Sequence, residues 1–235
     1  MPRCSTVIAL TLAPALAACG DDGPQDATVD IDNGSCGDQL RFTGELMDWD
    51  TQTRFCGVMG AVLENPGGSM DTTAPNGRFD LCLPGANKFD KLSVLFDTAP
   101  SQCTQTPSSY MMPVVVYADH GVIKGGGFYT ARAMTMARQA SFFQEIQQTM
   151  DPTRGHVVVH VNGMKQPKIT LAADHGPPQV TTATGWAPGD AGANVFFPNV
   201  AVGNVKLQIA GGGTGETEIP VVAGTITNVA VIPKP

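Results

Sequence analysis

The sequence has few basic residues. It contains 14 Lys and Arg against 21 Asp and Glu, which gives a formal net charge of −7. A nucleic-acid-binding protein needs a basic face to neutralise phosphates, and anionic lipid headgroups attract the same kind of surface. We therefore expect no nucleic-acid partner and no electrostatic attachment to a membrane.

Motifs of the common catalytic sites are also missing. The sequence has no G-x-S-x-G nucleophile elbow and no C-x-x-C pair of the kind that binds zinc. Its triple-glycine segments, 125–127 and 211–213, lack the Gly-Lys-Ser/Thr ending of a phosphate-binding loop. These absences predict a noncatalytic protein without catalytic residues, cofactor or bound metal.

A short apolar stretch near the start ends in the tetrapeptide LAAC, Leu16 to Cys19. It is too short to span a bilayer, which takes about 20 apolar residues, and it has the organisation of an export signal. The tetrapeptide resembles the lipobox of bacterial lipoproteins. That resemblance implies a signal peptide over residues 1–18 and a lipid on Cys19, and because Gly20 rather than Asp follows, it implies the outer membrane. The alternative is an ordinary secretory signal that happens to end in Cys.

Six cysteines occur, of which Cys4 would leave with the signal peptide and Cys19 would carry the lipid. An even number of remaining cysteines in an oxidising compartment predicts two disulfides. Three pairings are open, and proximity favours the first with the second and the third with the fourth; a zinc site is the alternative. The four candidates are Cys36, Cys56, Cys82 and Cys103.

The composition and hydrophobic pattern divide the rest of the chain into a tether, two strand-rich segments and a helix between them. Residues 19–39 are rich in Asp and Gly and predict a flexible tether. Alternating apolar and polar residues predict strands in 40–129 and again in 153–235. Between them, 130–152 lacks Gly and contains many good helix formers, which predicts one amphipathic linker helix that ends at Asp151-Pro152.

The two strand-rich halves look like a diverged repeat. The first contains Gly60-Ala61-Val62, then Thr72-Thr73, then Gly77-Arg78-Phe79 and Leu83-Pro84-Gly85; the second has a looser version. This order resembles the carboxypeptidase regulatory-like, or transthyretin-like, domains. The resemblance implies a mainly β protein with two Ig-like β-sandwich domains, 40–129 and 153–235, and a noncatalytic, accessory role.

Two pairs of residues are candidates for a site. Trp49 and Trp186 lie beside predicted turns and are possible sugar contacts, although each is also explained as a cap on the end of a sandwich. His156 and His160 fall on one side of a predicted strand, where they are possible metal ligands or ordinary sheet histidines.

The function predicted from the sequence is a lipid-anchored module of the bacterial cell envelope that binds or supports another envelope protein or a surface polysaccharide. The alternatives are a glycan-binding lipoprotein that uses the two tryptophans and a metal-dependent enzyme centred on the two histidines.

Overall fold

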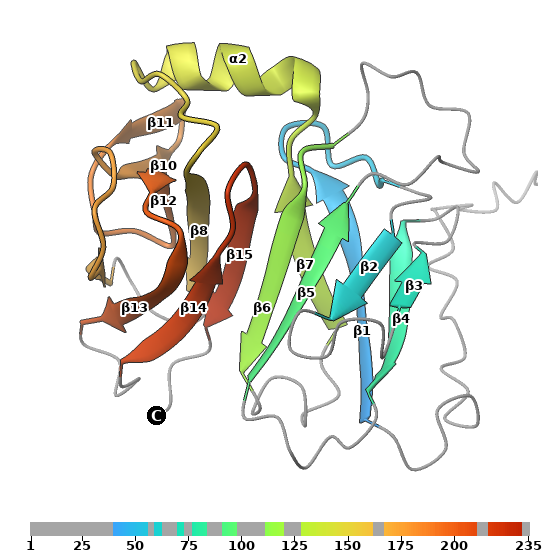
Figure 1. Ribbon diagram of the computed structural model, residues 1–235. Helices are drawn as coiled ribbons and strands as arrows, with labels where there is room; N and C mark the ends of the chain where they lie inside the picture. The colour runs from blue at the N-terminus through green and yellow to red at the C-terminus, as the bar shows by residue number, and fades with distance from the viewer. Residues whose placement is uncertain are drawn as a thin grey trace, which may run out of the picture. The chain divides into compact units, whose positions relative to one another are not determined.

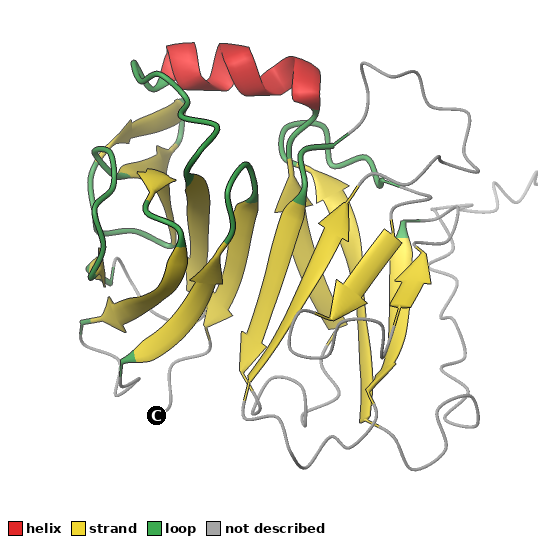
Figure 2. Ribbon diagram, viewed as in Figure 1, coloured by secondary structure: helices red, strands yellow, loops and turns green. Residues whose placement is uncertain are grey.

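Strands dominate the computed structural model (Figure 1), and Figure 2 shows how little of the described chain is helical. The structure describes residues 40–55, 59–62, 70–72, 77–83, 91–97, 111–119, 128–161, 167–210 and 216–231. The predicted signal peptide, tether and lipid-bearing Cys19 lie outside these residues, as do three of the four candidate disulfide cysteines. The fourth, Cys82, lies on a strand and has no free thiol; the disulfide pattern stays a prediction.

The described strands form a nine-stranded sheet and two three-stranded sheets. One small sheet has the order β4-β1-β7, made of Arg78–Leu83, Leu40–Asp48 and Phe128–Ala133. The other has the order β14-β13-β9, made of Thr217–Val221, Gly203–Ile209 and Ile169–Leu171. The large sheet has the order β11-β10-β12-β8-β15-β6-β5-β2-β3, made of Gly185–Pro188, Gln179–Thr182, Asn194–Val200, Gly155–Val161, Ile226–Val231, Val114–Asp119, Lys91–Asp97, Met59–Val62 and Met70–Thr72.

The large sheet is covered on both faces, by different layers. Because successive side chains of a strand point to opposite faces, Val157 and Val158 of β8 enter different cores. Val158 belongs to the core shared with the β4-β1-β7 sheet, which contributes Phe42 and Phe79. Val157 belongs to the core shared with the β14-β13-β9 sheet, to which Leu207 contributes. The result is a layered β arrangement of sandwich type.

Strand β15 joins the two halves of the chain, because it pairs in parallel with β8 on one side and with β6 on the other. All described residues fall in one compact unit, Cys36–Pro235. The predicted arrangement of two sandwich domains, 40–129 and 153–235, is therefore not confirmed. An edge strand leaves backbone N–H and C=O groups unpaired, and the pairing of β15 with β6 satisfies these groups.

The helix is shorter than the predicted segment 130–152: α2 spans Met136–Glu145. Residues up to Ala133 belong to β7 instead, where buried and exposed side chains alternate. Thr135 caps the helix through its side chain, which accepts a hydrogen bond from the backbone N–H of Arg138 at 3.1 Å. Past its end, Gln147 takes a φ of 55°, a left-handed conformation of the kind that often follows a helix C-terminus. No helix in the described part of the chain is long and apolar enough to cross a membrane.

Candidate functional site

The two candidate tryptophans lie close together in the structure. They are 137 residues apart in the sequence (186 − 49 = 137). Their ring centroids are 5.3 Å apart. Trp49 follows β1 in a turn, whereas Trp186, predicted in a loop, lies on β11, opposite Thr181 of β10. The fold thus brings one tryptophan from each half of the chain to a single place.

Helix α2 and the large sheet supply the rings that surround this pair. Phe142 lies 5.6 Å from Trp49 and 5.8 Å from Trp186, and Phe196 of β12 lies 5.9 and 6.1 Å from them. The phenylalanines are buried, whereas both tryptophans are half-buried. Tilted and edge-to-face aromatic pairs contribute roughly 0.5–1.5 kcal/mol each beyond burial. We call Trp49, Trp186, Phe142, Phe143 and Phe196 the aromatic junction.

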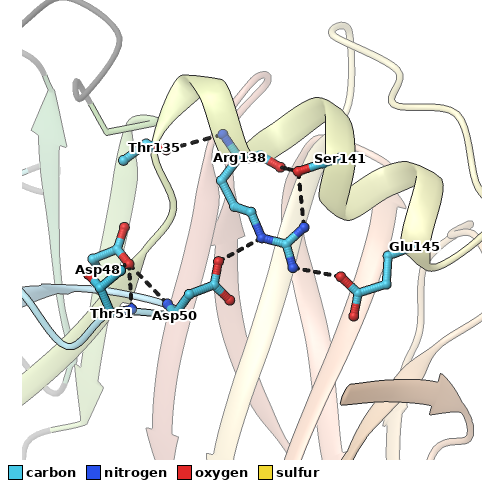
Figure 3. Close-up of polar contacts among 7 residues, drawn as sticks. All are labelled: Asp48, Asp50, Thr51, Thr135, Arg138, Ser141 and Glu145. Carbon is cyan, nitrogen blue, oxygen red and sulfur yellow. Dashed lines mark hydrogen bonds and ion pairs between the residues drawn. The ribbon is translucent and has the colours of Figure 1, made fainter. Parts of the chain in front are cut away.

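Charged side chains around Arg138 form a rim beside the aromatic junction, and Figure 3 shows the polar contacts among them. Arg138 of α2 donates from Nε to Asp50 at 2.6 Å and from Nη2 to Glu145 at 2.6 Å, and Ser141 accepts from Nη1 at 3.1 Å. The guanidinium also lies 5.5 Å from the centroid of the Phe142 ring. Because Asp50 comes from the turn after β1, these contacts attach the helix to that turn.

Asp48 shapes the turn that presents Trp49 and Asp50. Its Oδ1 accepts hydrogen bonds from the backbone N–H groups of Asp50 and Thr51, at 3.0 and 2.8 Å, and from the Thr51 hydroxyl at 2.9 Å. A side chain that bonds its own backbone two residues on is a common turn-forming device. Burial of Asp48 to 7% exposure makes this turn a fixed part of the fold.

His156 lies beneath α2 and is fully buried, in contact with the aromatic junction. Its ring centroid is 5.0 Å from that of Phe143. Its Nδ1 accepts a hydrogen bond from the backbone N–H of Asn199 at 3.0 Å, so the proton of the neutral ring is on Nε2. That nitrogen is buried and has no hydrogen-bond partner among the described residues. Burial lowers the pKa of His156 to about 4, against a smaller opposing effect of Asp151. His156 is therefore neutral at pH 7.

His160 lies four residues further along β8, on the same face. Its Nδ1 pairs with Oδ1 of Asn194 at 2.6 Å, and its Nε2 is buried. Burial lowers the pKa of His160, against smaller opposing effects of side-chain hydrogen bonds with Asn194 and Asn228, and the charge of Arg132 adds a still smaller lowering effect. In both candidate histidines Nδ1 is hydrogen-bonded, and among the described residues no group of three or more His, Cys, Asp and Glu could hold a metal.

Two further buried polar residues, which connect β7 to the large sheet, were missed by sequence reasoning. Asn228, buried in β15, accepts from the backbone N–H of Arg132 at 3.0 Å and donates to its carbonyl at 2.9 Å. Tyr129 donates from its hydroxyl to the carbonyls of Tyr117 and Asn228, each at 3.2 Å. Burial raises the pKa of Tyr129, which keeps the hydroxyl protonated. The sequence did contain one indication of a buried polar residue, because Asn228 lies within the largely apolar segment 226–231.

Comparison with known proteins gives only weak structural similarity. No protein-family model matches the chain, and no curated protein matches it. Among solved structures, the shaft pilin SpaA of Lactobacillus rhamnosus GG aligns with 84% of this chain and 99% of its own, at 9% identity and a TM-score of 0.28. The minor pilin GBS52 of Streptococcus agalactiae aligns with 83% and 97%, at 10% identity and a TM-score of 0.23.

The TIE protein of Bacillus anthracis aligns with 83% of this chain at 11% identity and a TM-score of 0.26. The alignment covers only 34% of the TIE protein chain, so the present chain corresponds to about a third of that chain's length.

Proposed function

We propose that this chain is a lipid-anchored, noncatalytic binding or structural module of the bacterial cell envelope, carried on the outer membrane. The observation that supports a structural role is the aromatic junction. Phe142 of α2 contacts Trp49 from one half of the chain and Trp186 from the other, which favours a rigid body. A preorganised surface loses less conformational entropy when it binds a partner.

The lipid anchor is tested by replacing Cys19→Ser, with Cys4→Ser as the matched control. Cys4 lies in the predicted signal peptide, so the control keeps the proposed acylation site. Detergent phase partition and intact mass are measured after expression in a bacterium that processes lipoproteins. We expect the control in the detergent phase with acyl mass, and Cys19→Ser in the aqueous phase without it. An unlipidated Cys19→Ser protein that still enters the detergent phase contradicts the anchor.

The binding role is tested by chemical cross-linking in intact cells, followed by mass spectrometry of the products. Wild type is compared with Cys19→Ser, which removes the proposed anchor without touching the fold described by the structure. We expect a reproducible envelope protein cross-linked to wild type and reduced with the released variant. Cross-links that are identical in the two proteins contradict a role that depends on envelope display.

A second candidate function is glycan binding at the rim of the aromatic junction. The observation that favours it is the combination of two half-buried indoles with exposed carboxylates, because Asp50 and Glu145 have side chains 44% and 38% exposed. Sugars stack on indole rings and donate hydroxyl hydrogen bonds to carboxylates.

This candidate is tested by retention on immobilised surface polysaccharide. Trp186→Ala and Glu145→Gln are expected to reduce retention, and Glu218→Gln, an exposed residue on β14, is the matched control. Glu145→Gln leaves the packing of the rings in place, so it separates lost recognition from lost stability. Retention equal to wild type in both rim variants excludes this site.

A further inference from the structure

Helix α2 lies across one end of the large sheet, between β7, which precedes it, and β8, which follows it (Figure 1). Its buried face consists of Phe142 and Phe143, with Ile146 at the C-cap. Its ion pair with the turn after β1 is at the surface, because the Arg138 and Asp50 side chains are 25% and 44% exposed. Few buried side chains therefore hold the helix on the sheet, and an element of this kind opens more readily than the whole fold.

The imidazole of His156 lies under this helix, in surroundings that suit only its neutral form. Its centroid is 5.0 Å from the Phe143 ring of α2 and 6.0 Å from the Phe196 ring of β12. Nδ1 is used as an acceptor by the Asn199 N–H, and Nε2 has no hydrogen-bond partner among the described residues. The backbone N–H of His156 donates to the Thr225 carbonyl at 2.8 Å, which keeps this end of β8 in the sheet.

Protonation of this ring creates two conflicts at once. The added proton goes to Nδ1, where the Asn199 N–H already points, so that two donors face each other. Asn199 is held in place, because its Oδ1 accepts from the Asp151 N–H and its Nδ2 donates to the Thr149 carbonyl, each at 2.8 Å. The second conflict is a positive charge against the Phe143 ring, and a buried charge without a partner is strongly unfavourable.

One charged group favours the protonated ring. Asp151, in the connection between α2 and β8, raises the pKa of His156, but by less than burial lowers it. Asp151 also lies 3.6 Å from Arg154, whose charge has the opposite sign. The ionisable residues of α2, Arg138 and Glu145, pair with each other in the rim, and β12 and β15, which flank β8, contain no ionisable residue. The surroundings therefore do not compensate for a charge on His156 while α2 covers it.

We propose that α2 is a pH-dependent cover: in mildly acidic solution, protonation of His156 favours release of the helix and uncovers the aromatic junction, while the sheets stay paired. Release moves Phe143 off the imidazole, so that water solvates the charged ring. Trp49, Trp186 and Phe196 lose the cover that Phe142 and Phe143 provide, and their rings become an apolar surface that is available in acid. This device does not depend on the lipid anchor or on glycan binding.

The test is residue-resolved hydrogen exchange of the full chain at pH 7 and pH 5, corrected for the intrinsic exchange rate. With the helix released His156 has its ordinary pKa of 6.5, and under the helix its pKa is about 4, so the released population should rise about twentyfold between these conditions. We expect the protected amides of α2 to lose protection by that factor.

Urea separates release of the helix from global unfolding. Local release exposes little surface, so exchange of the α2 amides should hardly change up to about 1 M urea. The amides of β13, on the sheet that packs against the other face of the large sheet, should exchange more slowly and accelerate with urea.

Two variants assign the effect to one ring. His156→Gln, whose amide oxygen can accept from the Asn199 N–H, should lose the change between pH 7 and pH 5. His160→Gln removes the other buried histidine of β8 and, as the matched control, should keep the change. If His156→Gln does not fold, the wild-type profile still decides, because release should increase about tenfold per pH unit below pH 6.5, where ordinary carboxylates do not titrate. Constant protection of α2, an equal change in His156→Gln, or a urea dependence equal to that of β13 overturns the proposal.

Discussion

Acidification should weaken the fold through His156. The residue is fully buried against Phe143, and its pKa is lowered from 6.5 to about 4. A folded-state pKa below the unfolded value means that unfolding takes up a proton in this range. The contribution is therefore complete above about pH 6.5 and is lost as the pH falls toward 4. The difference corresponds to about 3 kcal/mol in total, of which about 2 kcal/mol is lost by pH 4.5.

The assay is urea unfolding near pH 7 and pH 4.5 for wild type and His156→Gln. The amide does not titrate in this range, and its oxygen can accept from the Asn199 N–H in place of Nδ1. Both proteins lose stability through other groups, so the informative quantity is the difference between their losses. We expect wild type to lose about 2 kcal/mol more than the variant. Parallel losses in the two proteins refute the argument that burial keeps His156 neutral.

Three further substitutions test how the halves are joined. Tyr129→Phe removes a hydroxyl donor shared by two carbonyls, and we expect it to lower the free energy of unfolding by about 1–2 kcal/mol in urea titrations. Asn228→Ala leaves the N–H and C=O of Arg132 without these partners, for an expected loss of about 1–3 kcal/mol by the same measurement. Gly44→Ala places a Cβ against the Tyr129 carbonyl and the Phe79 ring, so we expect a loss of about 1–3 kcal/mol, seen as a lower thermal midpoint. Unchanged midpoints in these variants would show that the β7 contacts do not limit stability.

Strand positions in the chain could be predicted because the alternation is local. The segment 40–129 was predicted to contain strands, and Leu40–Asp48 and Arg78–Leu83 are two of those that the structure shows there. The helix was predicted too long because helix-forming residues continue into β7, where Tyr129, Ala131 and Ala133 alternate with exposed neighbours. In β7, packing into the core shared by the large sheet and the β4-β1-β7 sheet outweighed the local helix propensity.

The pairing that joins the two halves could not be predicted from the pattern. Parallel pairing of β15 with both β6 and β8 connects strands at least 65 residues apart (226 − 161 = 65). The same limit applies to the polar side chains that meet across β10, β12 and β8. Thr181 and His160 were assigned to strands, but only the register shows that Asn194 lies between them. Arg132, assigned to the linker helix, had no predicted relation to any of them. That Arg132 forms no ion pair with a carboxylate among the described residues becomes visible only when the neighbours of each arginine are known.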